Sequence, residues 1–551
     1  MKPYRLFLLI ALFVLCPTLS NPWLMARPED RAGDEKTIAV MGSSVAAGWV
    51  TSYEKKYDMM NGYAGRLERR LNGRGYTVKN ISVPGDDTKK VIERMDQDLS
   101  PLKPEYVIIG LSLGNEGVEE RDPQEVSDQF SEGLQKIIAR CREQKIAPIV
   151  GSCYSCNTYQ EAHYRAMKEM NLLINGWDIP SINFLGAMDN GCGHFPKGFT
   201  YDDGHPNNRG HEEMFYAIVP SLFDALELGK ARPSRPDKPG FVTMSGSKGE
   251  TPLSYIPSEI IHAFATVFSV RTSSAGVVGT IRTRSGERSL EIGKDGKLCY
   301  RSPGSKALFS AQKVLDGRWH DIAVSHRHLA GETLLFLDGE FVGSVPEQLE
   351  PVQFILAGGG QAPPETADYR DWMVYRSSLN IDEVKALHEG ELLQASLEVY
   401  APLNDAGLKK DSLVMNLAQS TSEVHAYPTA PGPALDLLRK KLEEADHARG
   451  KEPVFQEKKA IDMDPELLET YVGVYRMAPG ADLTISREGN KLYLTDPEGG
   501  KAELFPESRT GFFIKFPLAE LTIVFNRNSR NAVTHLVFSA NGDEQKAKKV
   551  E

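Results

Sequence analysis

The chain has 551 residues, of which 41% are hydrophobic and 25% charged, and its formal net charge is −11. That length exceeds what one hydrophobic core supports and predicts three or four domains. The acidic balance is mild and spread along the chain without a basic block, which argues against nucleic acid as a partner.

Residues 1–20 have the pattern of a secretory signal peptide. Lys2 and Arg5 form a positive region, Leu6–Leu15 an apolar region, and residues 18–20 a cleavage site. The apolar run is much shorter than the about 20 residues that a membrane-spanning helix needs, and no later segment is apolar enough to span. We therefore expect soluble export, to the periplasm, the cell surface or the medium.

Residues 36–229 alternate strand-like apolar runs with amphipathic helical segments. The predicted strands are Thr37–Met41, Thr77–Val83, Tyr106–Leu111, Ala147–Gly151 and Ser181–Leu185. The predicted helices are Gly62–Asn72, Thr88–Leu99, Pro123–Gln144, Asn157–Gly176 and Asn208–Leu228. This alternation predicts a parallel sheet covered on both faces, with ligands bound beyond the carboxyl ends of its strands.

The remainder of the chain predicts linkers and β-rich units. Residues 230–242 form a linker rich in proline and charge, and residues 243–402 predict an antiparallel β-sandwich with strands at Gly279–Thr283, Ser289–Ile292, Trp319–Ser325 and Thr333–Leu337. Residues 428–463 predict a second linker, with a solvated helix at Leu435–His447. Residues 464–551 predict a small β-rich domain with strands at Leu483–Ser486, Lys491–Thr495, Gly511–Phe516, Leu521–Asn526 and Ala532–Phe538.

A candidate catalytic set follows two of these segments. Ser44 lies on a turn of small residues, Met41-Gly42-Ser43-Ser44, directly after the first strand, and Asp202 and His205 share one loop. A serine that attacks acyl carbon needs a base to take its proton and an acid to orient that base. The alternatives are a phosphate-binding turn at Ser44, which lacks the glycines and lysine of such loops, and a plain surface turn at His205.

Two more segments fit a pocket for a tetrahedral intermediate. Gly85 follows the second strand, where its amide can point inward, and Asn115 follows the third, in Leu113-Gly114-Asn115-Glu116. Preorganised donors of this kind stabilise an oxyanion. Considered alone, Asn115 fits a helix cap or a turn equally well.

Export permits disulfides. After removal of the signal the chain has five cysteines, at Cys141, Cys153, Cys156, Cys192 and Cys299. We expect Cys153 or Cys156 to pair with Cys192, although the sequence does not give the pairing. Cys16 is an alternative lipid attachment site, disfavoured because Leu15 is larger than lipoprotein signals usually allow.

Metal binding is the competing interpretation of these side chains. The Cys153–Cys156 pair has only Cys192 and His194 nearby as further zinc ligands. His194, His205 and His211 also cluster in sequence, but their spacing matches no common zinc pattern. We therefore predict no metal at the site and no organic cofactor.

On these motifs, residues 36–229 resemble the SGNH (GDSL-type) hydrolase family. The family is named for blocks carrying serine, glycine, asparagine and histidine, which here match Ser44, Gly85, Asn115 and His205. The resemblance implies a flavodoxin-like α/β/α sandwich of five parallel strands. It also implies that Ser44 is the nucleophile, His205 the base and Asp202 the orienting acid. The oxyanion hole would consist of the Ser44 amide, the Gly85 amide and the Asn115 side chain.

The chain departs from the family pattern at two places. The usual Gly-Asp-Ser is Gly42-Ser43-Ser44, and the usual Gly-x-Asn is Leu113-Gly114-Asn115. Neither departure removes a residue to which the family assigns a role.

Two further resemblances concern the β-rich units. Residues 243–402 resemble a laminin-G or concanavalin A-like jelly-roll domain through the segments Asp316–Val324, Leu335–Gly339 and Tyr369–Tyr375. Such domains often bind glycans, sometimes with calcium, but we predict that Trp319, Trp372 and Tyr375 fill the core. Leu468–Tyr475 resembles the opening of small β-rich domains behind serine β-lactamase-like hydrolases, for which a structural or positioning role is expected.

Together these features predict an exported carbohydrate esterase that removes O-acyl groups, with O-acetyl favoured. Its partner is a small-molecule or polysaccharide ester substrate, and the oligomeric state is not given by the sequence. The alternatives are a lipase or thioesterase acting on lipid-like esters, and a glycan-binding protein that has lost activity.

Overall fold

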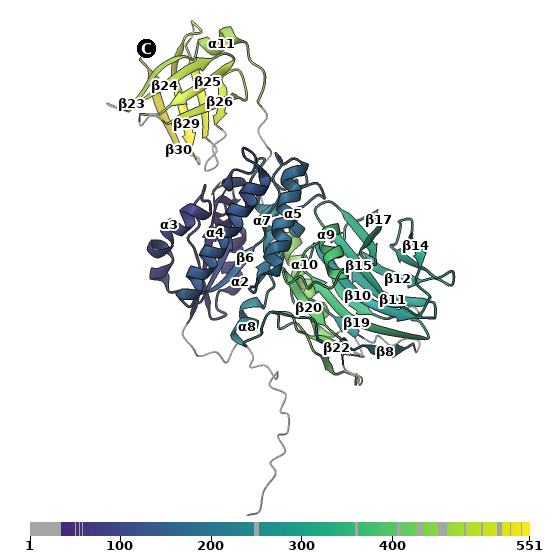
Figure 1. Ribbon diagram of the computed structural model, residues 1–551. Helices are drawn as coiled ribbons and strands as arrows, with labels where there is room; N and C mark the ends of the chain where they lie inside the picture. The colour runs from purple at the N-terminus through teal and green to yellow at the C-terminus, as the bar shows by residue number, and fades with distance from the viewer. Residues whose placement is uncertain are drawn as a thin grey trace, which may run out of the picture.

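The computed structural model describes an α/β unit, a two-sheet β unit and a C-terminal β-barrel (Figure 1). It covers residues 35–550 except 50, 54–55, 58, 247–252, 359–361, 405–407, 410, 427–431, 450–459, 479–480, 498–499, 515–520, 529 and 541–542. The predicted signal peptide, with Cys16, lies outside the described residues. Every helix among the described residues is too short or too polar to cross a membrane.

The α/β unit is built on a five-stranded parallel sheet in the order β4-β1-β5-β6-β7, the strand order of flavodoxin-like folds. The strands are β1 (Lys36–Gly42), β4 (Tyr76–Asn80), β5 (Tyr106–Gly110), β6 (Ala147–Gly151) and β7 (Ser181–Ile182). Every residue of β5 is buried, as expected where helices cover both faces. The predicted parallel sheet is confirmed, and its order reverses between β1 and β5, where ligands of such sheets bind.

Helices cover both faces of this sheet and enclose two cores. One core lies under α3, α4 and α5, and the other under α1, α2 and α6 to α8. The helices are α1 (Ser44–Ala47), α2 (Tyr63–Leu71), α3 (Thr88–Asp98), α4 (Pro123–Glu143), α5 (Glu161–Gly176), α6 (Phe184–Met188), α7 (Asn208–Tyr216) and α8 (Leu222–Glu227). Short elements complete the unit: β2 (Ser52–Tyr53), β3 (Lys56–Tyr57), η2 (Met59–Asn61), η3 (Ser100–Leu102) and η4 (Leu113–Glu116).

Several predicted elements differ from the structure in their bounds. The strand predicted at Thr77–Val83 ends at Asn80, and the helix predicted at Asn157–Gly176 begins at Glu161. The helix expected at Asn208–Leu228 is two helices, α7 and α8, because Pro220 lies between them and disfavours helical backbone at the residue before it. The last strand ends at Ile182 rather than Leu185, because the side chain of Asn183 accepts a hydrogen bond from the Gly186 amide and starts α6.

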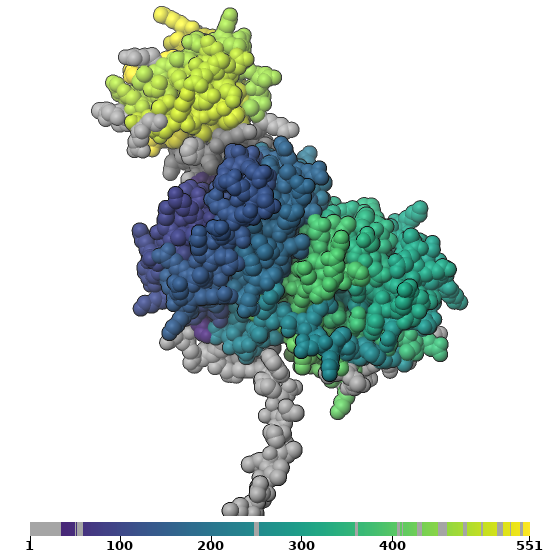
Figure 2. Space-filling model, in the orientation of Figure 1, coloured from purple at the N-terminus to yellow at the C-terminus, as the bar shows by residue number. Residues whose placement is uncertain are grey.

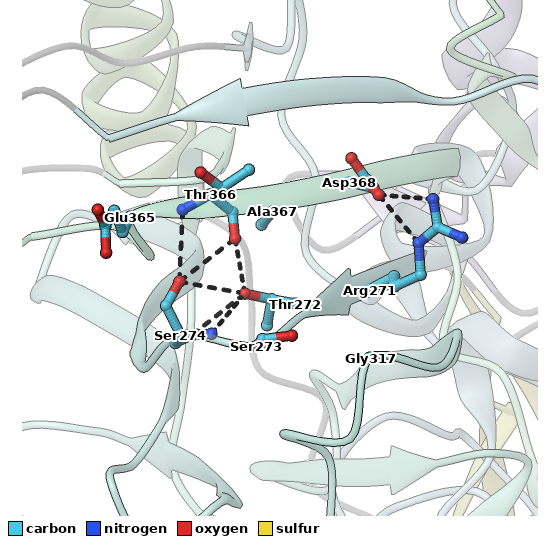
Figure 3. A pocket seen from close by; sticks show the side chains of 9 residues that line it. All are labelled: Arg271, Thr272, Ser273, Ser274, Gly317, Glu365, Thr366, Ala367 and Asp368. Carbon is cyan, nitrogen blue, oxygen red and sulfur yellow. Dashed lines mark hydrogen bonds and ion pairs between the residues drawn. The ribbon is translucent and has the colours of Figure 1, made fainter.

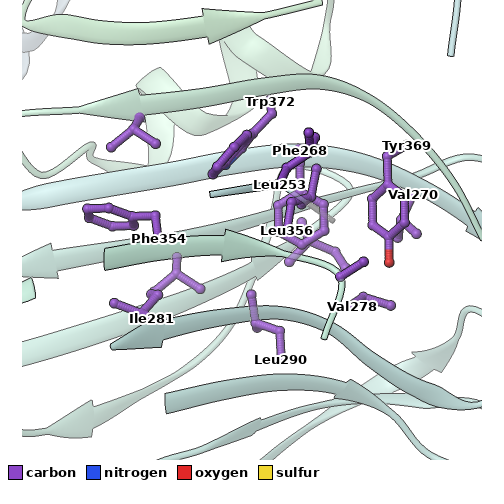
Figure 4. Close-up of a cluster of buried hydrophobic side chains, with 14 of the residues drawn as sticks. Leu253, Phe268, Val270, Val278, Ile281, Leu290, Phe354, Leu356, Tyr369 and Trp372 are labelled. Atoms are coloured by element: carbon purple, nitrogen blue, oxygen red, sulfur yellow. The ribbon is translucent and has the colours of Figure 1, made fainter. Parts of the chain in front are cut away.

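The β unit consists of two antiparallel sheets around one shared core (Figure 4). Their orders are β17-β16-β15-β10-β19-β20, with β8 paired to β19, and β14-β13-β12-β11-β18-β9-β22-β21. The elements are β8 (Val242–Ser245), β9 (Leu253–Tyr255), β10 (Phe264–Thr272), β11 (Gly276–Thr283), β12 (Gly286–Ile292), β13 (Lys297–Arg301), β14 (Leu308–Lys313), β15 (His320–Arg327), β16 (Glu332–Leu337), β17 (Glu340–Pro346), β18 (Pro351–Leu356), β19 (Thr366–Tyr375), α9 (Ile381–His388), β20 (Leu397–Ala401), β21 (Leu413–Val414) and β22 (Val424–Ala426).

The structure corrects two expectations for this unit. Its strands continue to Ala426, beyond the predicted end at residue 402. Trp372 is buried in the core between the sheets as predicted, but Tyr375 is buried in a separate cluster that includes residues of α9. Trp319 is only partly buried. The guanidinium groups of Arg271 and Arg370 lie 4.8 and 4.3 Å from the Trp319 ring centroid. The jelly-roll, laminin-G-like assignment stays a prediction.

The C-terminal unit is a closed barrel of eight antiparallel strands. Its interior is filled by side chains that include Tyr471, Tyr475, Phe512 and Phe525. Its elements are α11 (Pro465–Glu469), β23 (Gly473–Ala478), β24 (Ala481–Glu488), β25 (Lys491–Thr495), β26 (Lys501–Pro506), β27 (Gly511–Ile514), β28 (Leu521–Arg527), β29 (Val533–Ala540) and β30 (Asp543–Lys549). Residues 515–516 of the predicted strand Gly511–Phe516 lie outside the described residues.

The α/β unit and the two-sheet unit pack into one continuous body (Figure 2). Arg376, just after β19, is central to the contact. Its Nη1 donates to Glu398 Oε2 at 2.7 Å and its Nε to the carbonyl of Tyr216 at 2.7 Å, while Nη2 donates to the carbonyl of Ile260. The Arg376 and Glu398 side chains are 1% and 0% exposed, so this ion pair is fully buried at the junction.

Further buried polar contacts join the same two units. The Asn183 carboxamide donates to Glu383 Oε1 at 2.9 Å, and Asn175 Oδ1 accepts the amides of Gln394 and Ala395 at 3.1 and 2.9 Å. Buried polar groups need such partners to offset their lost hydration. The interface is therefore specific in its geometry rather than a loose contact.

The predicted linker at residues 230–242 is packed along both units. Lys230 Nζ donates to the carbonyls of Asn416 and Ser420, both at 2.7 Å. Arg235 forms an ion pair with Asp371 at 3.2 Å. These contacts hold the segment in place although it has little regular structure of its own.

The predicted solvated helix is also packed. It forms α10 (Pro433–Arg449), which buries Leu435, Leu438 and Leu442 in a small core with Ile260 and Val352. The three leucines fall on one helix face and are separated in sequence by charged residues, which gave the segment its solvated pattern. At its carboxyl end, Arg449 pairs with Glu212 of α7 at 3.2 Å.

Removal of the Arg376 charge is expected to destabilise this body strongly. Arg376→Ala leaves Glu398 buried without its counter-ion, a loss that costs about 3–5 kcal/mol in comparable pairs. The control is Lys136→Ala, which removes an exposed pair with Glu132 on α4 and should cost roughly 0.3–0.5 kcal/mol. Urea unfolding of both variants measures the difference, and equal costs would show that the buried pair does not support the junction.

Acid should weaken the same junction through His262. This fully buried ring shares a hydrogen bond with Glu213 of α7, Nδ1 to Oε1 at 2.8 Å, and burial lowers its pKa to about 4. In the unfolded chain the pKa of His262 has its usual value of 6.5. The stability that depends on neutral His262 is therefore complete above pH 6.5 and is lost as pH falls towards 4.

Glu383 changes the pH dependence of stability in the opposite direction. Burial raises its pKa to about 7, so the stability that its protonated form contributes is lost as pH rises from 4.5 to 7. The His262 contribution is therefore isolated by comparing variants. His262→Gln should flatten the dependence of Tm on pH between 6.5 and 4 relative to the wild type, whereas His447→Gln, at an exposed position on α10, should not. Identical pH profiles for His262→Gln and the wild type would contradict the assignment.

Candidate active site

Ser44 lies where β1 turns sharply into α1. Gly42 at the end of β1 and Gly110 on β5 approach each other through their backbones: a Cβ on Gly42 would lie 2.2 Å from the Gly110 carbonyl oxygen. Gly48 ends α1 with a φ of +80°, a conformation that favours glycine. These glycines let the short helix lie directly at the carboxyl edge of the sheet, with Ser44 as its first residue.

Ser44, His205 and Asp202 form one hydrogen-bonded line. The distance from Ser44 Oγ to His205 Nε2 is 2.9 Å, and His205 Nδ1 lies 2.9 Å from both carboxylate oxygens of Asp202. A carboxylate only accepts, so Nδ1 carries the ring proton and Nε2 is free to accept the proton of Ser44. The structure brings together the three residues that the sequence singled out.

The Asp202 carboxylate is fixed in its ionised form. Burial alone would raise its pKa, but hydrogen bonds and charge from His205, with the amides of Gly204 and His205, outweigh burial and hold the pKa below 3.8. Oδ1 accepts those two amides at 2.9 and 2.8 Å. The ionised carboxylate can therefore orient the imidazole and stabilise an imidazolium.

The loop that carries Asp202 and His205 is held from both sides. The Asn157 amide donates to the Asp203 carbonyl at 2.8 Å, and the Tyr201 amide donates to the His205 carbonyl at 2.9 Å. Directly after the loop, the Asn207 side chain caps α7. The histidine is thus supported by the segment after β6 and by α7.

The predicted disulfide is absent, since all five described cysteines are free. The Cys153 thiol is buried in the core under α4 and α5, where burial raises its pKa to about 12. Cys156 Sγ instead donates to the Asp203 carbonyl at 3.2 Å, and Cys192 is exposed. Cys156 therefore supports the loop that carries Asp202 and His205 as a thiol rather than through a bridge.

The loops that carry Gly85 and Asn115, the predicted oxyanion donors, both contact the turn that carries Ser44. The Val83 amide donates to the Gly42 carbonyl at 3.0 Å and so brings the loop with Gly85 against the turn. Asn115 Nδ2 donates to the Asp86 carbonyl at 2.8 Å and also contacts Ser43 Oγ. Within the described chain the amides of Ser44 and Gly85 donate to no protein acceptor, so both are available to a ligand.

Sequence reasoning missed several residues around this site. Ser43, in the place of the family's aspartate, contacts the Asn115 carboxamide. Arg94 on α3 pairs with Asp86 at 2.6 Å and donates to the Ile81 carbonyl at 2.8 Å, which fixes the loop that carries Gly85. The helical periodicity around Arg94 gave no signal of this contact, because its partners lie on a separate loop.

One cluster of possible metal ligands exists among the described residues, and it does not fit a metal. Glu213, His262 and His328 lie within 4.8 Å of one another, but the two imidazoles are stacked face to face with centroids 4.1 Å apart and planes at 14°. Imidazole binds a metal in its ring plane, so stacked rings cannot both face one ion. Arg449 Nη2 also lies 3.4 Å from His262 Nε2. The histidine and cysteine sets that the sequence offered do not converge.

A polar cavity of about 430 Å³ lies in the two-sheet unit and contains none of the triad (Figure 3). Arg271 and Asp368, which are opposite each other on the paired strands β10 and β19, form an ion pair at 2.7 Å at its lining (Figure 3). Thr272 Oγ1 donates to the Thr366 carbonyl at 2.7 Å. These lining groups already bond to one another. Glycan or calcium binding by this unit stays a prediction.

Comparisons with known proteins place the first unit. Residues 40–213 match the model of the GDSL-like Lipase/Acylhydrolase family, and residues 457–549 match a domain of unknown function (DUF3471). No curated protein matches the chain.

Three solved structures illustrate the structural matches. A catalytic mutant of an acetylxylan esterase from Geobacillus stearothermophilus is 15% identical, covering 34% of this chain and 93% of its own, with a TM-score of 0.28. TesA is 22% identical, covering 34% and 98%, with a TM-score of 0.29. A SAP-like pentraxin from Limulus polyphemus is 11% identical, covering 27% and 80%, with a TM-score of 0.23. By the family match, residues 40–213 of this chain form a GDSL-type (SGNH) hydrolase domain.

Proposed function

We propose that the protein is a serine esterase that removes O-acyl groups, with O-acetyl favoured, from a carbohydrate. The observation that carries the proposal is the line from Ser44 Oγ through His205 to Asp202, with 2.9 Å at each hydrogen bond. Support for ester hydrolysis comes from the matched family, whose description names lipases and acylhydrolases.

The groups of the site act in two stages, the acylation of Ser44 and its deacylation by water. Ser44 Oγ attacks the ester carbonyl carbon while His205 Nε2 takes its proton, and Asp202 stabilises the imidazolium that forms. The amides of Ser44 and Gly85 donate to the developing oxyanion. The Asn115 carboxamide joins them by turning one N–H from Ser43 Oγ, its acceptor in the resting site, to the oxyanion. His205 then returns the proton to the leaving alcohol oxygen, which frees the alcohol and leaves an acyl-serine. A water molecule, deprotonated by His205, releases the carboxylic acid and restores Ser44.

The carbohydrate part of the proposal rests on the resemblance of residues 243–402 to domains that often bind glycans, which is an analogy at the level of the fold. Export rests on the pattern of residues 1–20. A lipase or thioesterase would use the same triad on a longer acyl chain, so substrates of different acyl length separate these two activities.

Ser44 should be indispensable for ester hydrolysis. Wild-type protein is expected to release acetate from acetylated polysaccharides and from p-nitrophenyl acetate, and Ser44→Ala should lower kcat by on the order of 10⁴-fold or more. Acetate is measured directly and p-nitrophenolate by absorbance. A preference for p-nitrophenyl palmitate over the acetate would favour the lipase, and no hydrolysis of any ester would favour a binding protein.

Two neighbouring aspartates provide a matched test of the acid. Asp202→Asn should lower kcat by about 10⁴-fold, because an amide holds the imidazole in the wrong tautomer. Asp203→Asn removes the same charge from the same loop, but Asp203 is exposed and contributes its backbone carbonyl, so its kcat should stay close to the wild type. Steady-state kinetics on p-nitrophenyl acetate compare the two, and equal losses would contradict the assigned role.

A further inference from the structure

The two oxyanion donors outside the Ser44 turn come from separate loops. Gly85 follows β4, in the loop that leads into α3, and Asn115 lies in η4 after β5. β4 and β5 lie on either side of β1 in the sheet, and the ends of two strands that do not pair do not by themselves fix the spacing of their loops to a fraction of an ångström. Contacts between the loops must therefore set the distance between the Gly85 amide and the Asn115 carboxamide.

Hydrogen bonds connect these loops at two places. One runs from Asn115 Nδ2 to the Asp86 carbonyl at 2.8 Å. The other runs from the Thr88 amide to Glu116 Oε1 at 2.6 Å. Glu116 directly follows Asn115, and Thr88 is three residues after Gly85, so the second bond joins the loops next to both donors.

Glu116 is placed where its carboxylate acts on this spacing. It is 6% exposed and Thr88 is 3% exposed, and burial raises the pKa of Glu116. Thr88 is pressed against α4, since a Cβ on Gly133 would lie 2.4 Å from Thr88 Oγ1. A carboxylate on the first amide of a helix also gains from the helix dipole, which strengthens the bond.

The fold does not need Glu116 to form α3. Asp87 caps this helix independently, through the bond from the Lys90 amide to its side chain at 2.8 Å. Arg94 holds the same loop through Asp86 and Ile81. Glu116 is thus an additional tie at the point where the two loops meet.

From this placement we infer that Glu116 is a positioning residue, which sets the spacing of the Gly85 and Asn115 donors by holding the Thr88 amide. The inference rests on the proposed esterase activity. The donors act on charge that develops in the transition state, so misplacing them should lower kcat and leave KM little changed. A displacement of about 1 Å can cost roughly 10²-fold in rate.

The test uses the full-length chain and two variants that break the same bond from opposite sides. Glu116→Ala removes the acceptor. Thr88→Pro removes the donor, and proline is tolerated here because Thr88 is the first residue of α3 and Asp87 before it is extended, with φ −108° and ψ 180°. Glu116→Gln keeps an acceptor oxygen, and Glu120→Ala changes an exposed glutamate four residues on.

The readouts are kcat and KM for p-nitrophenyl acetate and the Ki of a phenylboronic acid, which forms a tetrahedral adduct on a reactive serine. Glu116→Ala and Thr88→Pro should each lower kcat by about 10–100-fold with KM nearly unchanged, and Ki should rise in parallel with the loss of kcat/KM. For Glu116→Gln and Glu120→Ala, kcat and Ki should stay within about threefold of the wild-type values. Thermal melting confirms that each variant is folded.

The outcomes separate this inference from the function on which it rests. If wild type hydrolyses the ester and the two bond-breaking variants do so equally well, the positioning role is wrong while the esterase stands. A loss of kcat without a matching rise in Ki overturns it too, because a general structural defect would then explain the loss. If wild type hydrolyses no ester, the proposed function fails, and the role of Glu116 falls with it.

Discussion

The close approach of two glycine backbones is the constraint on which the active site depends. A Cβ on Gly42 would lie 2.2 Å from the Gly110 carbonyl oxygen, and one on Gly110 would lie 2.4 Å from Tyr63 Oη and 2.9 Å from the Ala46 Cβ. The two glycines therefore let α1 lie directly on β1 and β5. This places Ser44 at the reversal of strand order, where loops from neighbouring strands can surround it.

The second unit is part of the scaffold of the active site. Helix α7 begins shortly after His205. The two-sheet unit contacts the carboxyl-terminal half of this helix, through His262 on Glu213 and through Arg376 on the Tyr216 carbonyl. A tethered module would leave the hydrolase domain free to move. Here the buried contacts make the sheets a support for the helix that follows His205.

Much of the hydrolase domain could be predicted because its signals are local. Apolar runs bounded by turns locate the parallel strands, and Ser44, Asp202 and His205 follow from short motifs beside those runs. Contacts between distant segments give no such signal. The pattern of α10 hides its buried leucines among charges. A bridge from Cys153 or Cys156 to Cys192 is expected from the sequence because it would tie the loop beside His205, and nothing local shows that Cys156 donates to the Asp203 carbonyl instead. Glu116 is visible beside Asn115, but its partner Thr88 is supplied by the fold.

The central claim is that Ser44, with donors from three separate segments, forms a preorganised site for an oxyanion. The most direct measurement is a crystal structure of the chain after reaction with diethyl p-nitrophenyl phosphate. The phosphorus should be bonded to Ser44 Oγ, with the phosphoryl oxygen about 2.7–3.1 Å from the amides of Ser44 and Gly85 and from Asn115 Nδ2. A phosphoryl oxygen turned to solvent, or no adduct on Ser44, would contradict it.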